Sequence, residues 1–285
     1  MTPTRPVMRY HGGKWKLAPW LIGFFPAHRV YVEPYGGGGS VLIRKAPAYA
    51  EVYNDLDSEV VNLFRTLRDR GDELRTKIAL TPFAREEYRA SYEVSTDPME
   101  QARRTMVRSF MGFGSNSLNR SIQSGFRSNS NRSGTTPARD WSNYPNAIES
   151  LIERLRGVVI ENRDACEVML CHDSATTVHY VDPPYVHETR MTATAHGAHG
   201  YKFEMTDADH ERMAETLREL SGMVVLSGYG CPMYDRLFGD WTRFERRALA
   251  DGALERTEVV WINPACAEAL ERDRAQAPLF AEGVE

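Results

Sequence analysis

The residues with the clearest chemical meaning stand in the segment HYVDPPYVHE, residues 179–188, where two prolines separate Asp182 from Tyr185. Proline fixes φ and has no backbone donor, so Pro183 and Pro184 should end a strand and stiffen the chain that follows. The segment therefore predicts a carboxylate and a phenol ring held rigidly just beyond a strand. In open α/β sheets this is the edge at which ligands bind.

A second group of residues follows an apolar segment at 29–34. The sequence VEPYGGGGS begins this group with Glu33 and Pro34 and ends it with Ser40, and its glycines are Gly36, Gly37, Gly38 and Gly39. Glycines after a strand let the backbone approach a ligand closely, and the first crossover of a doubly wound sheet is where nucleotide-like cofactors bind. The spacing does not match GxGxxG, which argues against a nicotinamide cofactor. A tight structural turn is the alternative interpretation.

Two further segments add polar groups to the same region. Asp55 follows the apolar segment 50–54, and an acidic residue there can accept hydrogen bonds from both hydroxyls of a ribose, or can cap the next helix. Near the N-terminus, RYHGGKWK places Tyr10 and Lys14 before a helix, although an ordinary loop with a solvated lysine is also consistent with it. Together with the glycines, Asp55 indicates an adenosine-containing ligand.

Strand and helix patterns alternate along the chain, as expected for an α/β fold with a mostly parallel sheet. Apolar periodicity predicts strands at 29–34, 50–54, 158–162, 176–182, 223–228, 242–247 and 257–263. It predicts helices at 57–69, 82–112, 141–157, 165–171, 207–220 and 232–238. Residues 112–136 are expected to form a hairpin or a partly ordered loop, residues 186–204 a mobile loop, and the tail beyond Cys266 a fraying helix at most.

The segments RYHGGK, VEPYGGGGS, YND and DPPY, in this order and with an insertion before the last, resemble the Dam-like family of DNA adenine methyltransferases. Members of that family transfer a methyl group from S-adenosyl-L-methionine to the exocyclic amino group of adenine in double-stranded DNA. The resemblance spans Arg9 to about Pro264. It implies a Rossmann-like class I methyltransferase sheet, mostly parallel with one antiparallel strand, formed by residues 1–56 and 157–285. It also implies an inserted helical target-recognition domain with a hairpin, residues 57–156.

The resemblance assigns roles to the residues that match. Tyr10 and Lys14 are expected at the amino-acid end of the cofactor, and the segment from Glu33 through the glycines to Ser40 around its methionine portion. Asp55 is expected to hold the ribose hydroxyls, and Asp182 to face both the cofactor and the base. Asp164 matches more loosely; it is expected near the cofactor's adenine, or as the cap of the following helix.

The chemistry of residues 182–185, called here the proline segment, then follows from the electronic structure of the base. The amino nitrogen of adenine is a poor nucleophile because its lone pair is delocalised into the ring. The Asp182 carboxylate and the Pro183 carbonyl can accept its two hydrogens, at about 1.5–3 kcal/mol for a bond to a charged group, while in-line positioning offers about 7–11 kcal/mol. Pro184 keeps the segment rigid, and Tyr185 stacks on a base flipped out of the duplex. This chemistry requires no metal and no nucleophilic Ser or Cys.

The net charge of -4 argues against a nucleic-acid partner, but the arginines are unevenly distributed. Residues 101–139, called here the arginine-rich segment, contain seven arginines and no Asp, Glu or Lys. The candidates for DNA phosphate contacts, with one or two reaching guanine, are Arg104, Arg108, Arg120, Arg127 and Arg132. A solvated basic surface is the alternative. The hairpin segment FGSNSLNRSIQSGF differs from the Tyr-Asn-Gly type of the best-known members, so no recognition sequence is predicted.

Other functions remain open at this stage. A cytosine amino group needs the same acceptors, although Asp at the head of the motif favours adenine; a nicotinamide oxidoreductase and an inactive DNA-binding homologue are the further alternatives. The chain contains no run of about 18 apolar residues and no signal-peptide pattern, which predicts a cytoplasmic protein without a membrane partner. Neither a metal nor an oligomer is required.

Overall fold

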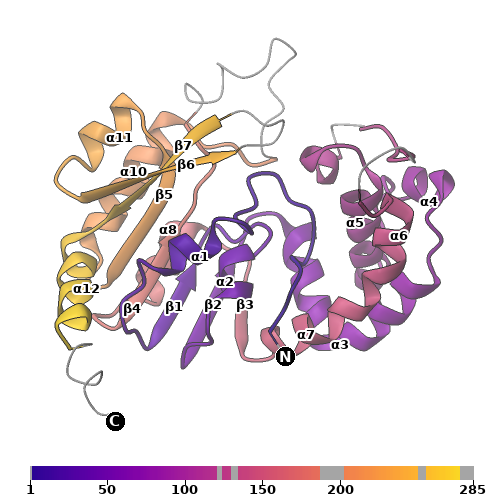
Figure 1. Ribbon diagram of the computed structural model, residues 1–285, viewed down its shortest axis with the longest axis horizontal. Coiled ribbons are helices and arrows are strands. Elements are labelled where there is room, and N and C mark those ends of the chain that lie inside the picture. Colours follow the sequence, from indigo (N-terminus) through magenta and orange to yellow (C-terminus); the bar gives the residue numbers. More distant parts are fainter. Residues whose placement is uncertain (1, 121–123, 130–133, 187–201, 250–254, 277–285) are drawn as a thin grey trace.

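The computed structural model describes residues 2–120, 124–129, 134–186, 202–249 and 255–276. At its centre is a seven-stranded sheet with the order β3-β2-β1-β4-β5-β7-β6 (Figure 1). The strands are β1 (Val30–Glu33), β2 (Ala50–Asn54), β3 (Val158–Glu161), β4 (Thr177–Val181), β5 (Met223–Tyr229), β6 (Thr242–Leu249) and β7 (Glu255–Ile262). Strand β7 pairs antiparallel with both β5 and β6, and the other pairs are parallel. The prediction of a mostly parallel α/β sheet is confirmed.

Side chains alternate between the two faces of this sheet, since successive residues of a strand point to opposite sides. One face buries Tyr31, Tyr53, Tyr180 and Val225 against α1 (Ala18–Ile22), α2 (Ser40–Arg44) and α12 (Pro264–Gln276). The other face buries Val181, Val224, Leu226 and Trp261 against α8 (Ala165–Cys171), α10 (Asp207–Glu219) and α11 (Pro232–Leu237). The sheet is therefore covered by helices on both sides, and polar groups can reach a ligand only at its edges.

The order of the strands reverses between β1 and β4. Val30 pairs with Ala50 of β2 on one side and with Thr177 of β4 on the other, so β1 lies between two parallel neighbours. The carboxyl ends of all three strands, at Glu33, Asn54 and Val181, meet at one edge. A reversal of this kind opens a crevice beyond the carboxyl ends, because the crossovers on its two sides leave in opposite directions.

A helical segment lies between β2 and β3, to one side of the sheet beyond β3 (Figure 1). It contains α3 (Ser58–Leu80), α4 (Arg85–Ala90), α5 (Pro98–Met111), a 3-10 turn (Ser115–Leu118), α6 (Pro137–Asn143) and α7 (Pro145–Leu155). Helix α3 packs against α5 and α7 and is kinked at Arg70, whose φ of -138° is not helical. The predicted helix at 57–69 thus continues to Leu80.

Several predicted boundaries in this segment are wrong. Residues 82–112 are not one helix, because α4 ends at Ala90 and Asp97 caps a new helix that begins at Pro98. The predicted helix at 141–157 is divided at Tyr144, since Pro145 cannot donate to the preceding turn. Outside this segment, the tail beyond Cys266 was predicted to be a helix at most, and it is helical to Gln276 in the described residues.

The expected hairpin is represented, in the part described, by a short antiparallel contact. Gly112 and Phe126 form an isolated bridge, and Phe113 N donates to Gly125 O over 2.7 Å. The centre of this segment, 121–123, and most of the predicted loop 186–204 lie outside the described residues.

A buried ion cluster joins the helical segment to the sheet. Glu51 of β2 lies 2.6 Å from Lys45 Nζ and also pairs with Arg154 of α7, whose guanidinium donates to Leu42 O over 2.6 Å. All three charged side chains are at most 6% exposed. Ion pairing compensates for the cost of burying these charges and ties α7 to strand β2.

Candidate active site

A cavity of about 880 Å³, including its open mouth, lies at the carboxyl ends of β1, β2 and β4. Ten predicted cofactor residues line it: Tyr10, Lys14, Glu33, Pro34, Gly36, Gly37, Gly38, Ser40, Asp55 and Asp182. Pro184 of the proline segment also lines it, while Pro183 and Tyr185 are buried and are not among the lining residues. Residues from four separate parts of the chain therefore meet at one place, as the convergence of parallel strand ends predicts.

Residues 36–39, called here the glycine turn, lie against aromatic rings that leave no room for a side chain. A Cβ on Gly36 would lie 2.2 Å from the Tyr53 ring, and one on Gly37 would lie 2.6 Å from the Tyr10 ring. Gly37 also has a φ of +48°, which residues with a side chain rarely adopt. Gly39 forms the rear of the turn and does not line the cavity. The glycines are thus required by the close approach of two tyrosines as well as by any ligand.

Asp55 holds the glycine turn and faces the cavity. Its Oδ2 accepts from Gly37 N over 2.8 Å, and its Oδ1 accepts from Asp57 N over 2.7 Å. The cap of α3 is Asp57, which accepts from Glu59 N over 3.0 Å, so Asp55 itself is not that cap. Burial raises the pKa of Asp55 to about 6, which leaves it mostly charged at neutral pH.

Glu33 is a buried carboxyl at the end of β1. Its Oε2 accepts from Tyr31 OH over 2.7 Å and from Leu42 N over 2.9 Å, which fixes the start of α2 against the strand. Burial raises the pKa of Glu33 to about 8, so this group is mostly neutral at pH 7. It can then donate a hydrogen bond into the cavity as well as accept one.

Asp182 lies at the end of β4 and is held by groups from three other elements. Its Oδ2 lies 3.0 Å from Lys14 Nζ, and its Oδ1 accepts from Ser227 of β5 over 2.8 Å. Tyr185 OH donates to the same Oδ1 over a longer 3.3 Å. The side chain of Asp182 is 17% exposed, which leaves part of it open toward the cavity. The carboxylate is thus oriented before any ligand arrives.

The ring of Tyr185 is buried beside this carboxylate. Its hydroxyl donates to Glu258 of β7 over 3.0 Å, and its ring meets Tyr229 edge-on with centroids 4.5 Å apart. The ammonium of Lys14 lies 4.8 Å from the ring centroid, a cation-π distance. Lys14 therefore contacts both the acid and the ring that the two prolines hold.

Sequence reasoning missed Ser227, Tyr229 and Glu258. Ser227 and Glu258 stand in the predicted strands 223–228 and 257–263, and Tyr229 is the residue directly after the first of them, where β5 ends. The available signal was the presence of Ser and Glu within otherwise apolar, buried strands, since such polar groups are buried only with partners. Leu56, Ala165, Phe203 and Met205 also line the cavity and give it apolar walls.

Asp164 is the N-terminal cap of α8, as the second of its two interpretations predicted. It caps α8 by accepting from Cys166 N over 2.9 Å and from Glu167 N over 3.2 Å, and it pairs with Arg212 at 2.7 Å. The Arg212 hydrogen bonds lower its pKa. Its neighbour Ala165 lines the cavity and Asp164 does not, so a contact with the cofactor's adenine stays a prediction.

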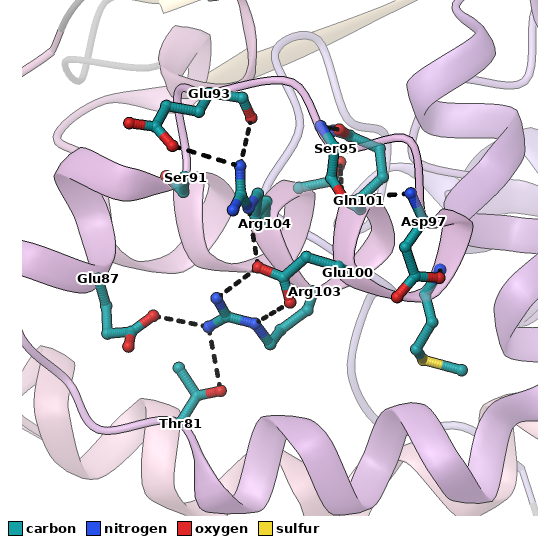
Figure 2. A network of polar contacts seen from close by, with 12 residues as sticks. Thr81, Glu87, Ser91, Glu93, Ser95, Asp97, Glu100, Gln101, Arg103 and Arg104 are labelled. Carbon is teal, nitrogen blue, oxygen red and sulfur yellow. Dashed lines mark hydrogen bonds and ion pairs between the residues drawn. The ribbon is translucent and has the colours of Figure 1, made fainter.

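The three arginines of α5 in the arginine-rich segment are paired with acids that precede the segment in the chain. Figure 2 shows Arg103 and Arg104 of α5 both turned toward Glu100, which lies 2.8 Å from each. Arg103 also pairs with Glu87 of α4 at 2.7 Å, and Arg104 donates to the Glu93 carbonyl over 3.0 Å. These contacts hold α4 and the 91–97 connection against α5, and they reduce the positive charge that the sequence suggested.

Three other candidates differ in their accessibility. Arg108 has no exposed surface and pairs with Glu59 and the Ser91 carbonyl, so the structure corrects its assignment as a phosphate contact: it is an internal ion-pair partner. Arg120 lies 2.9 Å from Glu59 with 19% of its side chain exposed. Arg127 is half-buried and donates to Phe110 O over 2.9 Å. Arg132 lies outside the described residues.

Glu59 also reaches the wall of the cavity. Lys202 lies 3.7 Å from Glu59 and donates to Asp57 over 2.8 Å, and residues 202–205 form one side of the cavity. A single carboxylate at the start of α3 therefore contacts α5, the loop after α5 and the cavity wall.

Within the described ranges, no helix is both long and apolar enough to cross a bilayer. The same ranges hold no cluster of three or more His, Cys, Asp or Glu side chains arranged to bind a metal ion.

Comparison with known proteins places the chain among DNA-modifying enzymes. Residues 10–248 match the family of D12 class N6 adenine-specific DNA methyltransferases, which depend on S-adenosylmethionine. The chain is also similar to the type II methyltransferase M1.LlaDCHI of Lactococcus lactis subsp. cremoris, with 25% identity over 258 residues that cover 83% of this chain and 85% of the relative. The family match includes the N-terminal lysine, the glycine turn and the proline segment that meet at the cavity. The chain belongs to the D12 class of N6 adenine-specific DNA methyltransferases.

Proposed function

We propose that this chain methylates the exocyclic amino group of an adenine flipped out of duplex DNA, at a specific recognition sequence. The observation that carries the proposal is the place of Asp182, which lines the same cavity as Asp55 and lies next to the buried Tyr185, whose hydroxyl is 3.3 Å from the Asp182 carboxylate. This arrangement brings together an acceptor for an amino group, an aromatic ring beside it and an acceptor for hydroxyl groups.

The cavity fits S-adenosyl-L-methionine in its chemistry. Asp55 would accept hydrogen bonds from the ribose hydroxyls, and the apolar side chains of Leu56, Phe203 and Met205 would contact the adenine ring. Lys14 would pair with the carboxylate of the methionine portion, and the glycine turn brings backbone groups close to it. When bound, the cofactor supplies a methyl group on a positively charged sulfur.

The protein's own residues would prepare the amino group of the target base. Asp182 Oδ2 and the Pro183 carbonyl would accept hydrogen bonds from its two N–H groups, which reduces delocalisation of the lone pair into the ring, and one of the two protons would leave once the nitrogen carries the methyl group. Tyr185 holds the base flat, so that the lone pair faces the methyl donor. Most of the rate enhancement should come from this alignment, since about 7–11 kcal/mol is available from positioning.

Lys14 has to move for the base to bind in this way. Its ammonium lies over the face of the Tyr185 ring on which the base would stack. It also pairs with Asp182 Oδ2, the carboxylate oxygen to which the amino group would donate. A shift toward the carboxylate of the cofactor would clear this place and keep the lysine charge paired. The cofactor would thereby prepare the site for the base.

We assign target recognition to residues 57–156. Helices α3 to α7 form a unit between β2 and β3, and the bridge between Gly112 and Phe126 projects a loop from it. Arg120 and Arg127 are the predicted phosphate contacts that keep exposed surface there, and Phe113, 73% exposed, is an aromatic side chain on the same loop. A DNA substrate also supports the cytoplasm as the place of action.

Sequencing with modification detection tests the proposal directly. DNA from cells that express the chain should carry N6-methyladenine within one defined motif, and DNA from cells that express Asp182→Ala should not. Methylation of cytosine N4 would favour the cytosine alternative. Unmodified DNA, with cofactor binding retained, would favour an inactive DNA-binding homologue.

A further inference from the structure

Two buried polar side chains, Ser227 and Glu258, lie directly behind the proline segment. Ser227 is 1% exposed on β5, and Glu258 is 8% exposed on β7. Neither is among the residues that line the cavity, so neither is placed to touch a ligand there. Both instead contact the two side chains that would meet the target base.

Ser227 determines which oxygen of Asp182 faces the cavity. Its Oγ donates to Asp182 Oδ1 over 2.8 Å, and Tyr180 OH lies 3.0 Å from the same Oγ. Because Oδ1 accepts from Ser227 and lies 3.3 Å from the Tyr185 hydroxyl, rotation of the carboxylate would break the Ser227 hydrogen bond and lose the Tyr185 contact. Oδ2 is thereby kept toward Lys14, at the place where an amino group would donate.

Glu258 holds the hydroxyl of Tyr185. The 3.0 Å bond to Glu258 is shorter than the 3.3 Å bond to Asp182, so the phenol is held mainly by β7. Glu258 lies directly opposite Tyr229 across the β5–β7 pair, and the Tyr229 ring packs edge-on against Tyr185. Two residues paired directly across β5 and β7 thus fix Tyr185: Glu258 holds its hydroxyl, and Tyr229 packs against its ring.

The burial of Glu258 is unfavourable by itself, which argues that it has a purpose beyond packing. Burial raises the pKa of Glu258, the neighbouring Asp182 raises it further, and the charges of Lys14 and Arg256 oppose this change. An apolar residue would avoid the cost of desolvating a carboxylate beside another carboxylate. The hydroxyl of Tyr185 gives the buried carboxylate a partner and makes the ring position depend on it.

We propose that Ser227 and Glu258 are positioning residues for methyl transfer, with Ser227 fixing the Asp182 carboxylate and Glu258 fixing the Tyr185 ring. The inference rests on the proposed function. It predicts that both residues affect the chemical step and the stacking of the flipped base, while cofactor affinity changes little.

The test uses the full chain, labelled S-adenosyl-L-methionine and a duplex oligonucleotide that carries the motif found by sequencing. Ser227→Ala should lower kcat by roughly 10- to 100-fold, because a hydrogen bond to a charged group is lost, and the cofactor Kd should stay within about twofold. Ser227→Thr, which keeps the hydroxyl, should recover most of the activity. Ser221→Ala, at an exposed position before the same strand, is the matched control and should behave as the unchanged protein.

Glu258→Ala should lower kcat about tenfold and Glu258→Gln less, since the glutamine carbonyl can still accept from the Tyr185 hydroxyl. With 2-aminopurine at the target position, Glu258→Ala should give brighter fluorescence than the unchanged protein, because a loosely held ring stacks less well on the flipped base. Glu245→Ala, on β6 and half-exposed, is the matched control.

A double-mutant cycle separates positioning from a general structural role. If Glu258 acts through the hydroxyl, Tyr185→Phe should lower kcat by itself and Glu258→Ala should add less than about twofold in that background. Tyr185→Phe leaves Glu258 in place and keeps the test valid where Glu258→Ala does not fold. Full kcat in Ser227→Ala and Tyr185→Phe, or additive effects in the cycle, would overturn the inference while the proposed function stands. Absence of methyl transfer by the unchanged chain would refute the proposed function, and the inference with it.

Discussion

Replacement of Asp182 by alanine is the perturbation that separates chemistry from cofactor binding most directly. Asp182 lines the cavity, but its oxygens contact Lys14, Ser227 and Tyr185 rather than the glycine turn. Removal of the carboxylate takes away one of the two acceptors for the target amino group. It leaves Asp55 and the apolar walls of the cavity unchanged.

The size of the effect follows from these contacts. A lost hydrogen bond to a carboxylate is worth about 1.5–3 kcal/mol, and loss of the alignment that depends on it removes part of the 7–11 kcal/mol available from positioning. We expect kcat to fall at least about a thousandfold, or ~4 kcal/mol. Lys14 keeps its hydrogen bond to the Gly12 carbonyl, so the free energy of unfolding should fall by only about 1–3 kcal/mol.

Transfer of labelled methyl to duplex DNA gives kcat, isothermal titration calorimetry gives the cofactor Kd, and urea denaturation gives the stability. Asp207→Ala, exposed in the first turn of α10, is the matched control. The cofactor Kd of Asp182→Ala should stay within about tenfold, a change of ~1.4 kcal/mol. Activity within tenfold of the unchanged protein would refute the role of Asp182 as acceptor.

Three further outcomes are expected. Cofactor affinity should fall as the pH is lowered through about 6, because burial raises the pKa of Asp55 to about 6 and protonation removes an acceptor for the ribose hydroxyls. Titration calorimetry from pH 5 to 8 measures this change. The same pH dependence in Asp55→Asn would show that another group is responsible. Arg120→Ala should weaken DNA binding and reduce the slope of log K against log salt by about 0.9, as for one lost phosphate contact, and an unchanged slope would place Arg120 away from the phosphates. Glu51→Gln should lower the free energy of unfolding by about 3–5 kcal/mol, because Lys45 and Arg154 would stay buried without their carboxylate. Urea denaturation measures it against the exposed Glu73→Gln, and a loss below about 1 kcal/mol would contradict this account of the cluster.

The positions of the strands and the convergence of the site were predictable from sequence. Buried strands are short apolar runs bounded by glycine, proline or acidic residues, and such boundaries are local. The meeting of Asp55 and Asp182 followed from one rule, that parallel strands end at the same edge, whereas the place of Lys14 was implied by the family resemblance. The spacing of these two aspartates along the chain, more than 100 residues, did not matter to that rule.

The charge of the arginine-rich segment could not be predicted in the same way. Its local sequence contains no acid, but Glu59, Glu87 and Glu100 approach its arginines from other turns or helices. Which acid pairs with which arginine depends on how α3, α4 and α5 pack, and periodicity carries no information about the angles between helices. For the same reason, Ser227 and Glu258 were recognised as parts of strands and not as partners of the proline segment.

Glu59 gives one consequence for how the two substrates affect each other. It is a shared counter-ion for Arg108 inside the helical segment, Arg120 on the loop and Lys202 on the cavity wall. If a DNA phosphate draws Arg120 away, as the proposed contact requires, more of the Glu59 charge is left for Lys202, which would strengthen the wall around the cofactor. Thermodynamic reciprocity would then require the bound cofactor to raise the affinity for DNA by the same factor. Competition among three cations for one acid would in this way couple the binding of the two substrates.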